Sequence, residues 1–111
     1  MSARVASGVL VNALVRRVSQ AGGFATVLAK GDATAGAILI VAQDRGEQAR
    51  VWERGIGPRG EIELIAVGPE GDAQAVADYW MKRRRTDPDL WVVELDVAQA
   101  ERFAAETMLN D

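Results

Sequence analysis

Residues 37–43 read Ala-Ile-Leu-Ile-Val-Ala-Gln, a run in which every side chain before Gln43 is apolar. A strand with no polar side is usually covered on both of its faces. The run therefore predicts a strand at the centre of a sheet.

The next two strands are predicted at Ala49–Arg54 and Glu61–Val67, joined as a hairpin by the glycine-rich loop Gly55–Gly60. Polar and apolar side chains match across the hairpin in one register. That register pairs Arg54 with Glu61, Trp52 with Glu63 and Val51 with Leu64. It gives the two glutamates a structural role and requires no catalytic one.

The chain before the central strand predicts a helix and a further strand. Apolar side chains recur at three- and four-residue spacing over Gly8–Ala21, and Gly22-Gly23 supplies a left-handed stop. The valines of this segment lower its helix propensity, so a strand at Val9–Val11 stays open as an alternative. Phe24–Lys30 predicts the strand that follows.

The chain beyond the hairpin predicts two helices with a strand between them. Asp72 is a good N-cap for a helix that ends near Arg85. Leu90–Asp96 predicts the last strand, and Asp96 with Gln99 predicts a capping box for a final helix that ends near Leu109.

These elements follow one another in the order α-β-β-β-β-α-β-α within one domain that spans residues 1–111. A run of strands followed by helices is typical of the α+β class. We therefore expect a mostly antiparallel sheet of about five strands, with three helices packed on one face. The sequence leaves open whether the last strand joins the sheet parallel or antiparallel.

The composition excludes several kinds of chemistry. The chain has no Cys and no His, so it can form neither disulfides nor metal sites with thiolate or imidazole ligands. Catalytic triads built on Ser-His or Cys-His pairs are excluded for the same reason. A magnesium or calcium site made only of carboxylates stays chemically open. We expect no catalytic residues, no metal and no cofactor, and a binding protein rather than an enzyme.

Charge is unevenly distributed along the chain, which has a net charge of −3. Residues 1–60 carry 8 Lys and Arg against 4 Asp and Glu, and residues 61–111 carry 5 against 12. Arg16 and Arg17 form one basic cluster, and Lys82–Arg85, which includes Arg83 and Arg84, forms a second. Clustered guanidiniums can bind phosphate, but basic residues in the last turn of a helix also complement its dipole. The acidic net charge favours the second interpretation.

Trp52 differs from the other two tryptophans. Trp80 and Trp91 are expected in the core, whereas Trp52 shares its face of the strand with Arg50 and Arg54. A Trp between arginines can stack against them and is a favoured anchor of protein interfaces. These three residues are therefore candidate binding residues for a partner protein or for a second copy of the chain.

The chain predicts no membrane-spanning segment. Its longest apolar run beyond the first helix, Gly36–Ala42, is far shorter than the ~20 residues needed to cross a bilayer. Arg16 and Arg17 lie where a secretory signal should be uncharged. We therefore expect a cytoplasmic protein.

Several short motifs stand out along the chain. They are Leu14-Val15-Arg16-Arg17, then Lys30-Gly31-Asp32 with Ala35-Gly36-Ala37, and most clearly Arg85-Thr86-Asp87-Pro88-Asp89-Leu90-Trp91-Val92-Val93-Glu94. On these motifs the chain resembles the domain of unknown function family 1491, small proteins of alphaproteobacteria. The family has no assigned activity, so the resemblance implies no substrate, cofactor or catalytic residue. Asp87 and Asp89 are expected to cap backbone amides and to hold the guanidiniums of the preceding helical turn.

Two functions follow from these observations. The favoured one is a non-enzymatic interaction or regulatory module, which could also form a homodimer, and which binds through the sheet face around Trp52. The alternative is a binder of a phosphate-bearing ligand or nucleic acid through Arg16, Arg17 and Lys82–Arg85. Convergence of both basic clusters on one concave surface is the observation that would favour the alternative.

Overall fold

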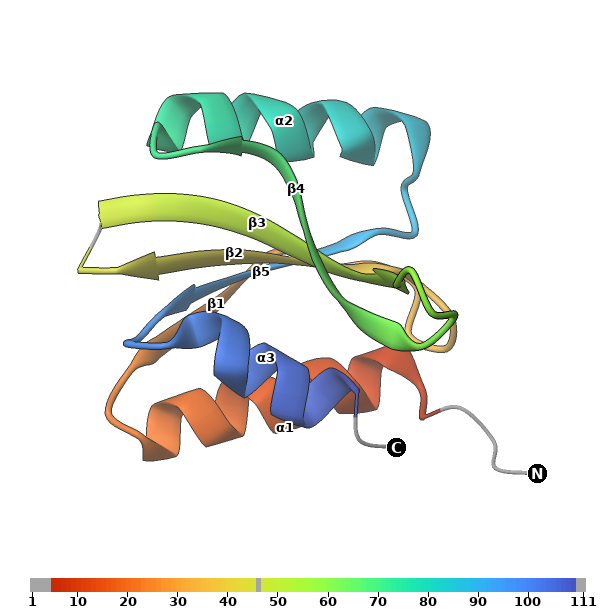
Figure 1. The fold of residues 1–111 in the computed structure, drawn as a ribbon, viewed down its shortest axis with the longest axis horizontal. Coiled ribbons are helices and arrows are strands. Elements are labelled where there is room, and N and C mark those ends of the chain that lie inside the picture. Colours follow the sequence, from red (N-terminus) through yellow and green to blue (C-terminus); the bar gives the residue numbers. More distant parts are fainter. Residues whose placement is uncertain (1–4, 46, 110–111) are drawn as a thin grey trace.

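The computed structural model describes residues 5–45 and 47–109 (Figure 1). Helices and strands follow one another in the predicted order, which confirms the α+β class and the helix, rather than a strand, at the start. The elements are α1 (Ser7–Gln20), β1 (Phe24–Ala29), β2 (Ile38–Asp44), β3 (Glu47–Ile56), β4 (Ile62–Glu70), α2 (Ala73–Thr86), β5 (Trp91–Asp96) and α3 (Ala100–Met108).

The five strands form one sheet with the spatial order β1-β5-β2-β3-β4. β2 is the central strand, as its apolar run predicts. β5 lies between β1 and β2; it runs antiparallel to β1 and parallel to β2, where Val93 lies opposite Ile40. The other neighbouring strands are antiparallel. The direction of the last strand, which the sequence left open, is therefore different toward each of its two neighbours.

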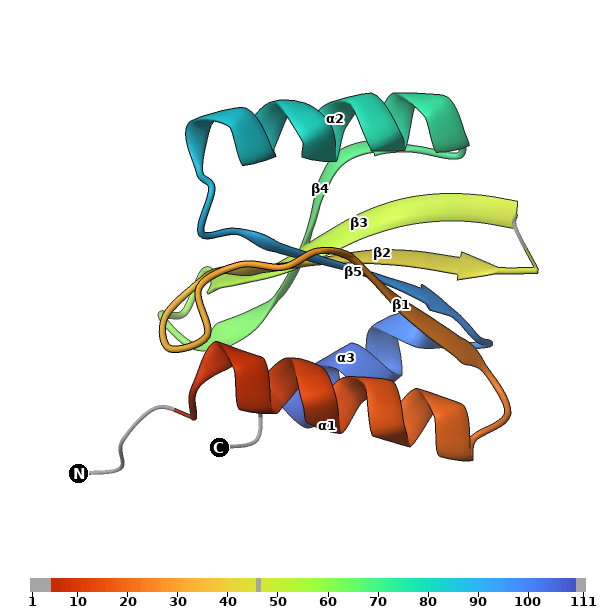
Figure 2. The ribbon, with the colours of Figure 1, turned by 180° about the vertical axis from the view of Figure 1, so that it is seen from behind.

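The helices cover both faces of the sheet, so the expectation of three helices on one face is wrong. α1 and α3 lie side by side on one face, and α2 lies on the other, over β3 and β4 (Figures 1 and 2). The reason is that β2 has two apolar faces, and each of them needs to be covered. Ile38, Ile40 and Ala42 belong to the core beneath α1 and α3, and Leu39 and Val41 belong to the core beneath α2.

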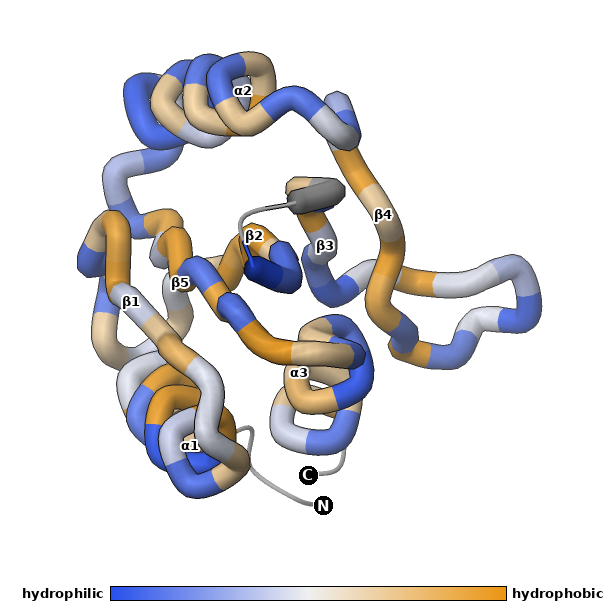
Figure 3. The backbone as a smooth tube through the Cα atoms, turned by 90° about the vertical axis from the view of Figure 1, so that its left-hand side faces the viewer, coloured by the Kyte–Doolittle hydropathy of each residue, from blue (hydrophilic) through white to orange (hydrophobic). Residues whose placement is uncertain are grey.

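Each side of the sheet thus has its own apolar core, and the sheet lies between two helical layers (Figure 3). Trp91 is 6% exposed and belongs to the core with α1 and α3, as predicted. Trp80 is only partly buried and packs at the margin of the core with α2. Each large aliphatic side chain that is fully buried stabilises the fold by about 1.5–3 kcal/mol.

The β3–β4 hairpin forms, but its predicted register is wrong. Trp52 lies opposite Ala66 and not Glu63, and Val51 lies opposite Val67 and not Leu64. Arg54, which was expected opposite Glu61, instead lies opposite Leu64.

The cause of this difference is the length of β3 at the hairpin end. β3 extends beyond its predicted end at Arg54 to Ile56, which pairs with Ile62, the first residue of β4. A tight turn follows, in which the N–H of Gly57 donates to the carbonyl of Glu61 (2.7 Å). Glu63 then lies opposite Gly55, and Glu61 lies before β4 begins, so the predicted Arg54–Glu61 pair does not form. Extending the backbone ladder outweighs the matching of polar side chains.

The two predicted helix caps have different outcomes. Asp72 caps α2 as predicted, because its carboxylate accepts a hydrogen bond from the N–H of Gln74 (3.0 Å). The capping box at α3 is wrong: Asp96 accepts instead from the N–H of Arg45 (2.7 Å), and the side chain of Gln99, the N-cap, makes no capping hydrogen bond. Asp96 ends β5 beside the turn after β2, so its carboxylate is used there.

Within the part of the chain that the structure describes, no helix is both long enough and apolar enough to span a bilayer.

Candidate functional site

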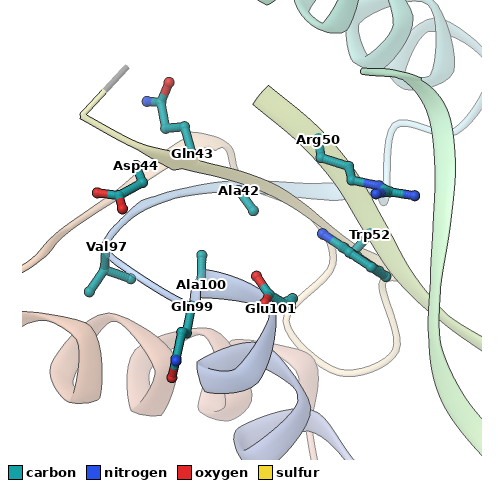
Figure 4. Close-up of a pocket in the computed structure, with 9 residues that line it drawn as sticks. All are labelled: Ala42, Gln43, Asp44, Arg50, Trp52, Val97, Gln99, Ala100 and Glu101. Atoms are coloured by element: carbon teal, nitrogen blue, oxygen red, sulfur yellow. The ribbon is translucent and has the colours of Figure 1, made fainter. Parts of the chain in front are cut away.

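The candidate site is a pocket of about 420 Å³ on the side of the sheet that α1 and α3 cover (Figure 4). It lies where β2 and β5, which are parallel, reach their carboxyl ends and α3 begins. In sheets with parallel strands, ligands usually bind outside these carboxyl ends. The lining residues come from β2, β3, the β5–α3 connection and the start of α3: Ala42, Gln43, Asp44, Arg50, Trp52, Val97, Gln99, Ala100 and Glu101.

Arg50 and Trp52, two of the predicted binding residues, form the β3 wall of this pocket. The guanidinium carbon of Arg50 lies 5.0 Å from the centre of the Trp52 ring, within the range of a cation–π contact. Arg50 also forms an ion pair with Glu70 of β4 (3.4 Å) and keeps 47% of its side chain exposed. The Arg50 guanidinium is therefore held between the Trp52 ring and the Glu70 carboxylate, while about half of the Arg50 side chain stays accessible to a partner.

The opposite wall consists of residues that were not among the predicted binding residues. Asp44, Gln99 and Glu101 are exposed there, at the end of β2 and at the start of α3. They meet only because β5 is parallel to β2, and this direction was not determined by the sequence. The available signal was the position of Asp44 and Asp96 at the ends of two apolar strands, which share one edge when the strands are parallel.

Arg54, the third predicted residue of this face, does not line the pocket. Its guanidinium donates a hydrogen bond to the main-chain carbonyl of Met108 (3.1 Å), at the last turn of α3. A cation at this end complements the helix dipole. Arg54 thus holds α3 against β3 and helps to position the wall opposite Trp52.

The two basic clusters lie on opposite sides of the sheet. Arg16 and Arg17 belong to α1, and Arg83 and Arg84 belong to α2 (Figures 1 and 2). The structure therefore does not bring them together on one concave surface.

Arg17 is used in a contact between the helices of its layer. Its guanidinium lies 2.8 Å from the carboxylate of Glu106 on α3 and donates to the hydroxyl of Thr107 (3.0 Å). Glu106 also accepts a hydrogen bond from Arg102 (2.9 Å). The bond from Arg102, together with the weaker effect of Arg17, lowers the pKa of Glu106 below its ordinary value. Arg16, one residue earlier, is exposed.

Arg83 is used in the contact between α2 and the sheet. Its guanidinium donates two hydrogen bonds to the carboxylate of Glu53 on β3 (2.7 and 3.2 Å) and one to the hydroxyl of Tyr79 (3.3 Å). The bonds to Glu53 raise the pKa of Arg83 above its ordinary value despite partial burial. This bidentate geometry is the stronger form of an ion pair.

Arg84 is bound by carbonyl groups and not by the two aspartates of the motif, so that part of the prediction is wrong. It donates to the main-chain carbonyls of Pro88 and Leu90, which follow α2. The expected amide cap is present at Asp87, whose carboxylate accepts from the N–H of Asp89 (3.2 Å). Both contacts stabilise the connection from α2 to β5.

Acidic side chains do not gather into a metal centre in residues 5–45 and 47–109, where no three of them lie close enough to hold an ion.

Two of the motifs singled out in the sequence meet at the other end of the parallel strand pair. Asp32 is bound there twice through its backbone: its N–H donates to the carbonyl of Asp89 (3.0 Å), and its carbonyl accepts from the indole of Trp91 (2.8 Å). Its carboxylate accepts from the N–H groups of Thr34 and Ala35 (3.2 and 2.8 Å). The motifs therefore build one structural joint, which lies away from the pocket.

Comparison with known protein families tests the predicted resemblance. A model described as "Protein of unknown function (DUF1491)" matches residues 5–105. The chain belongs to the DUF1491 family. Its resemblance to this family is thereby confirmed.

Solved structures of DUF1491 proteins have the same fold. A crystal structure of a DUF1491 family protein from Caulobacter crescentus CB15 is 35% identical, with a TM-score of 0.80, and covers 89% of this chain and 94% of that one. An NMR structure from the same organism is 34% identical, with a TM-score of 0.78 and coverage of 92% and 94%. The solution structure of Atu0922 from A. tumefaciens is 30% identical, with a TM-score of 0.73 and coverage of 96% and 93%. A comparison of this DUF1491 chain with curated proteins gave no match.

Proposed function

We propose that this DUF1491 protein is a small, non-enzymatic, cytoplasmic interaction module, and that a partner protein binds at the pocket around Trp52. The observation that carries the proposal is the Arg50–Trp52 stack at the wall of a pocket of about 420 Å³. Trp and Arg are the residues most enriched among the energetic centres of protein interfaces.

The chemistry of the lining favours a protein partner over a small molecule. Pockets for small ligands are lined mainly by hydrophobic and aromatic side chains, with few polar groups. Here most of the lining is polar or charged, and Trp52 is the one aromatic side chain: Gln43, Asp44, Arg50, Gln99 and Glu101 surround it. A polar rim around a single aromatic anchor is typical of a protein interface.

The alternative, a site for a phosphate-bearing ligand or nucleic acid, has less support from the geometry. Its two clusters face opposite sides of the sheet, and Arg17, Arg83 and Arg84 already bind groups of the protein itself. If a basic surface bound nucleic acid, the affinity would fall steeply with salt concentration.

The experiment is photo-crosslinking in cells, with a benzophenone amino acid in place of Glu101 at the pocket or of Arg59 in the exposed β3–β4 turn. We expect a protein adduct from position 101 that Trp52→Ala removes, and no such adduct from position 59. The partner identified from the adduct should then be purified, and its dissociation constant should be at least about tenfold higher for Trp52→Ala, as expected for a residue at the energetic centre of an interface. The proposal would be overturned if Trp52→Ala changed neither the adduct nor the affinity while its circular dichroism spectrum matched that of wild type.

A further inference from the structure

The two edges of the sheet differ in how well they are protected from other strands. β4 forms one edge, and it carries Glu63, Glu70, Pro69 and Gly68, which has a positive φ of 67°. Its pairing with β3 is also irregular between Arg50 and Val51. Charge, proline and irregular pairing are the usual means by which edge strands avoid pairing with another chain.

β1 forms the other edge and has few of these protections. Its sequence, Phe-Ala-Thr-Val-Leu-Ala, contains no charged residue and no proline. Its pairing with β5 is regular from Phe24 to Val27 and shifts only beyond that point. Phe24 is 74% exposed and Val27 is 41% exposed. A neutral, apolar edge strand of this kind is a template for an additional strand.

We infer that β1 pairs antiparallel with β1 of a second copy of this chain, so that two five-stranded sheets become one continuous sheet. The strand is complementary to itself because it has no charge that would face a like charge across a two-fold axis. We place the two-fold axis at Thr26, so that Thr26 faces its own copy and Phe24 lies on the same face of the joined sheet as Thr26 and Leu28 of the other copy. The exposed aromatic ring is thereby covered without any charged group being buried.

The helix beneath β1 supports the same occupant. A two-fold axis normal to the sheet brings the outer flanks of the two α1 helices side by side. At 100° per residue, this flank of α1 carries Asn12, Val15 and Ser19, because Arg17 points the other way, to Glu106 of α3. Arg16 lies opposite the buried side of the helix and not on the flank. The residues of β1 and the three residues of this flank are therefore uncharged.

The test is the oligomeric state of the full chain, measured by sedimentation equilibrium up to about 100 µM. We expect a dimer whose dissociation constant rises at least about tenfold in Thr26→Lys, because the edge then carries a charge facing itself across the axis. The matched control is Ile56→Lys at the tip of the β3–β4 hairpin, where Ile56 is 70% exposed, and it should leave the dimer unchanged. Trp52→Ala should also leave it unchanged, which separates this inference from the proposed function.

A second measurement covers the case in which Thr26→Lys does not fold. The chain contains no cysteine, so Thr26→Cys and Arg59→Cys each introduce a single thiol. A short crosslinker with two thiol-reactive ends should give a covalent dimer from position 26 and none from position 59. A wild-type chain that stays monomeric at the highest concentration, or a dimer that crosslinks no better at position 26 than at position 59, would overturn the inference.

Discussion

Replacing Gly31 with Ala tests the joint that the family motifs form. Gly31 lies against the backbone of the α2–β5 connection. A β-carbon at this position would lie 2.7 Å from both the backbone nitrogen and Cδ1 of Trp91, and closer still to the carbonyl oxygen of Asp89. Carbon atoms in proteins keep about 3.5–4.0 Å from their neighbours, so the connection must move by roughly 1 Å to admit a methyl group.

The free-energy cost of that movement follows from the hydrogen bonds it disturbs. Asp32 makes one to Asp89 (3.0 Å) and one to the Trp91 indole (2.8 Å), and both depend on the present separation. Each is worth about 0.5–1.5 kcal/mol, and forcing a methyl group into a packed site adds about 1–3 kcal/mol. We therefore expect Gly31→Ala to lower the free energy of unfolding by about 3 kcal/mol.

Urea unfolding followed by tryptophan fluorescence and circular dichroism measures this change. At a typical slope of about 1.5 kcal/mol per molar urea, the midpoint should fall by about 2 M. Gly8→Ala is the matched control. Gly8 belongs to α1, and a β-carbon at this position would lie at an ordinary 3.4 Å from the carbonyl oxygen of Ala33. The control should be as stable as wild type or up to about 1 kcal/mol more stable. A loss below about 1 kcal/mol in Gly31→Ala would refute the view that this joint is tightly packed.

Two further predictions concern ion pairs between elements. A double-mutant cycle with Arg83→Gln and Glu53→Gln, measured by urea unfolding, should give a coupling free energy of about 1–2 kcal/mol. The paired side chains are 30% and 24% exposed, so the pair lies between an exposed and a buried ion pair. Additive effects of the two substitutions would contradict this. For Glu106, whose folded-state pKa is lowered by Arg102, the stabilisation is present above the ordinary value of 4.5 and is lost as the pH falls through the lowered pKa. Glu106→Gln should therefore be less stable than wild type at neutral pH and equally stable in acid, and a stability difference that does not change with pH would count against the pair.

The local parts of the fold could be predicted from the sequence because they depend on neighbouring residues. The apolar run of β2 indicated a central strand, and Asp72 indicated the start of α2. The stack of Arg50 on Trp52 followed from their shared face of one strand. In each case the deciding interaction lies within a few residues or follows from burial alone.

The remaining features depend on contacts between distant segments. The β3–β4 register was set by extending the ladder to Ile56 and Ile62, which side-chain matching did not reveal. The pocket forms only because β5 lies parallel to β2. This arrangement places Glu101, which is distant in the sequence, near Trp52. Tertiary packing overrides local patterns in such cases, as it does for strand preferences in general.

The insertion of β5 between β1 and β2 has a consequence for biosynthesis. β1 leaves the ribosome well before β5, which comes after α2 and which, among the described residues, is the one strand that pairs with β1. Pairing across such a long stretch of chain is slow because the intervening loop must close first. In a nascent DUF1491 chain, β1 and the edge of β2 that faces β5 therefore stay unpaired until residues 91–96 emerge. Demand for chaperones should be highest in that interval.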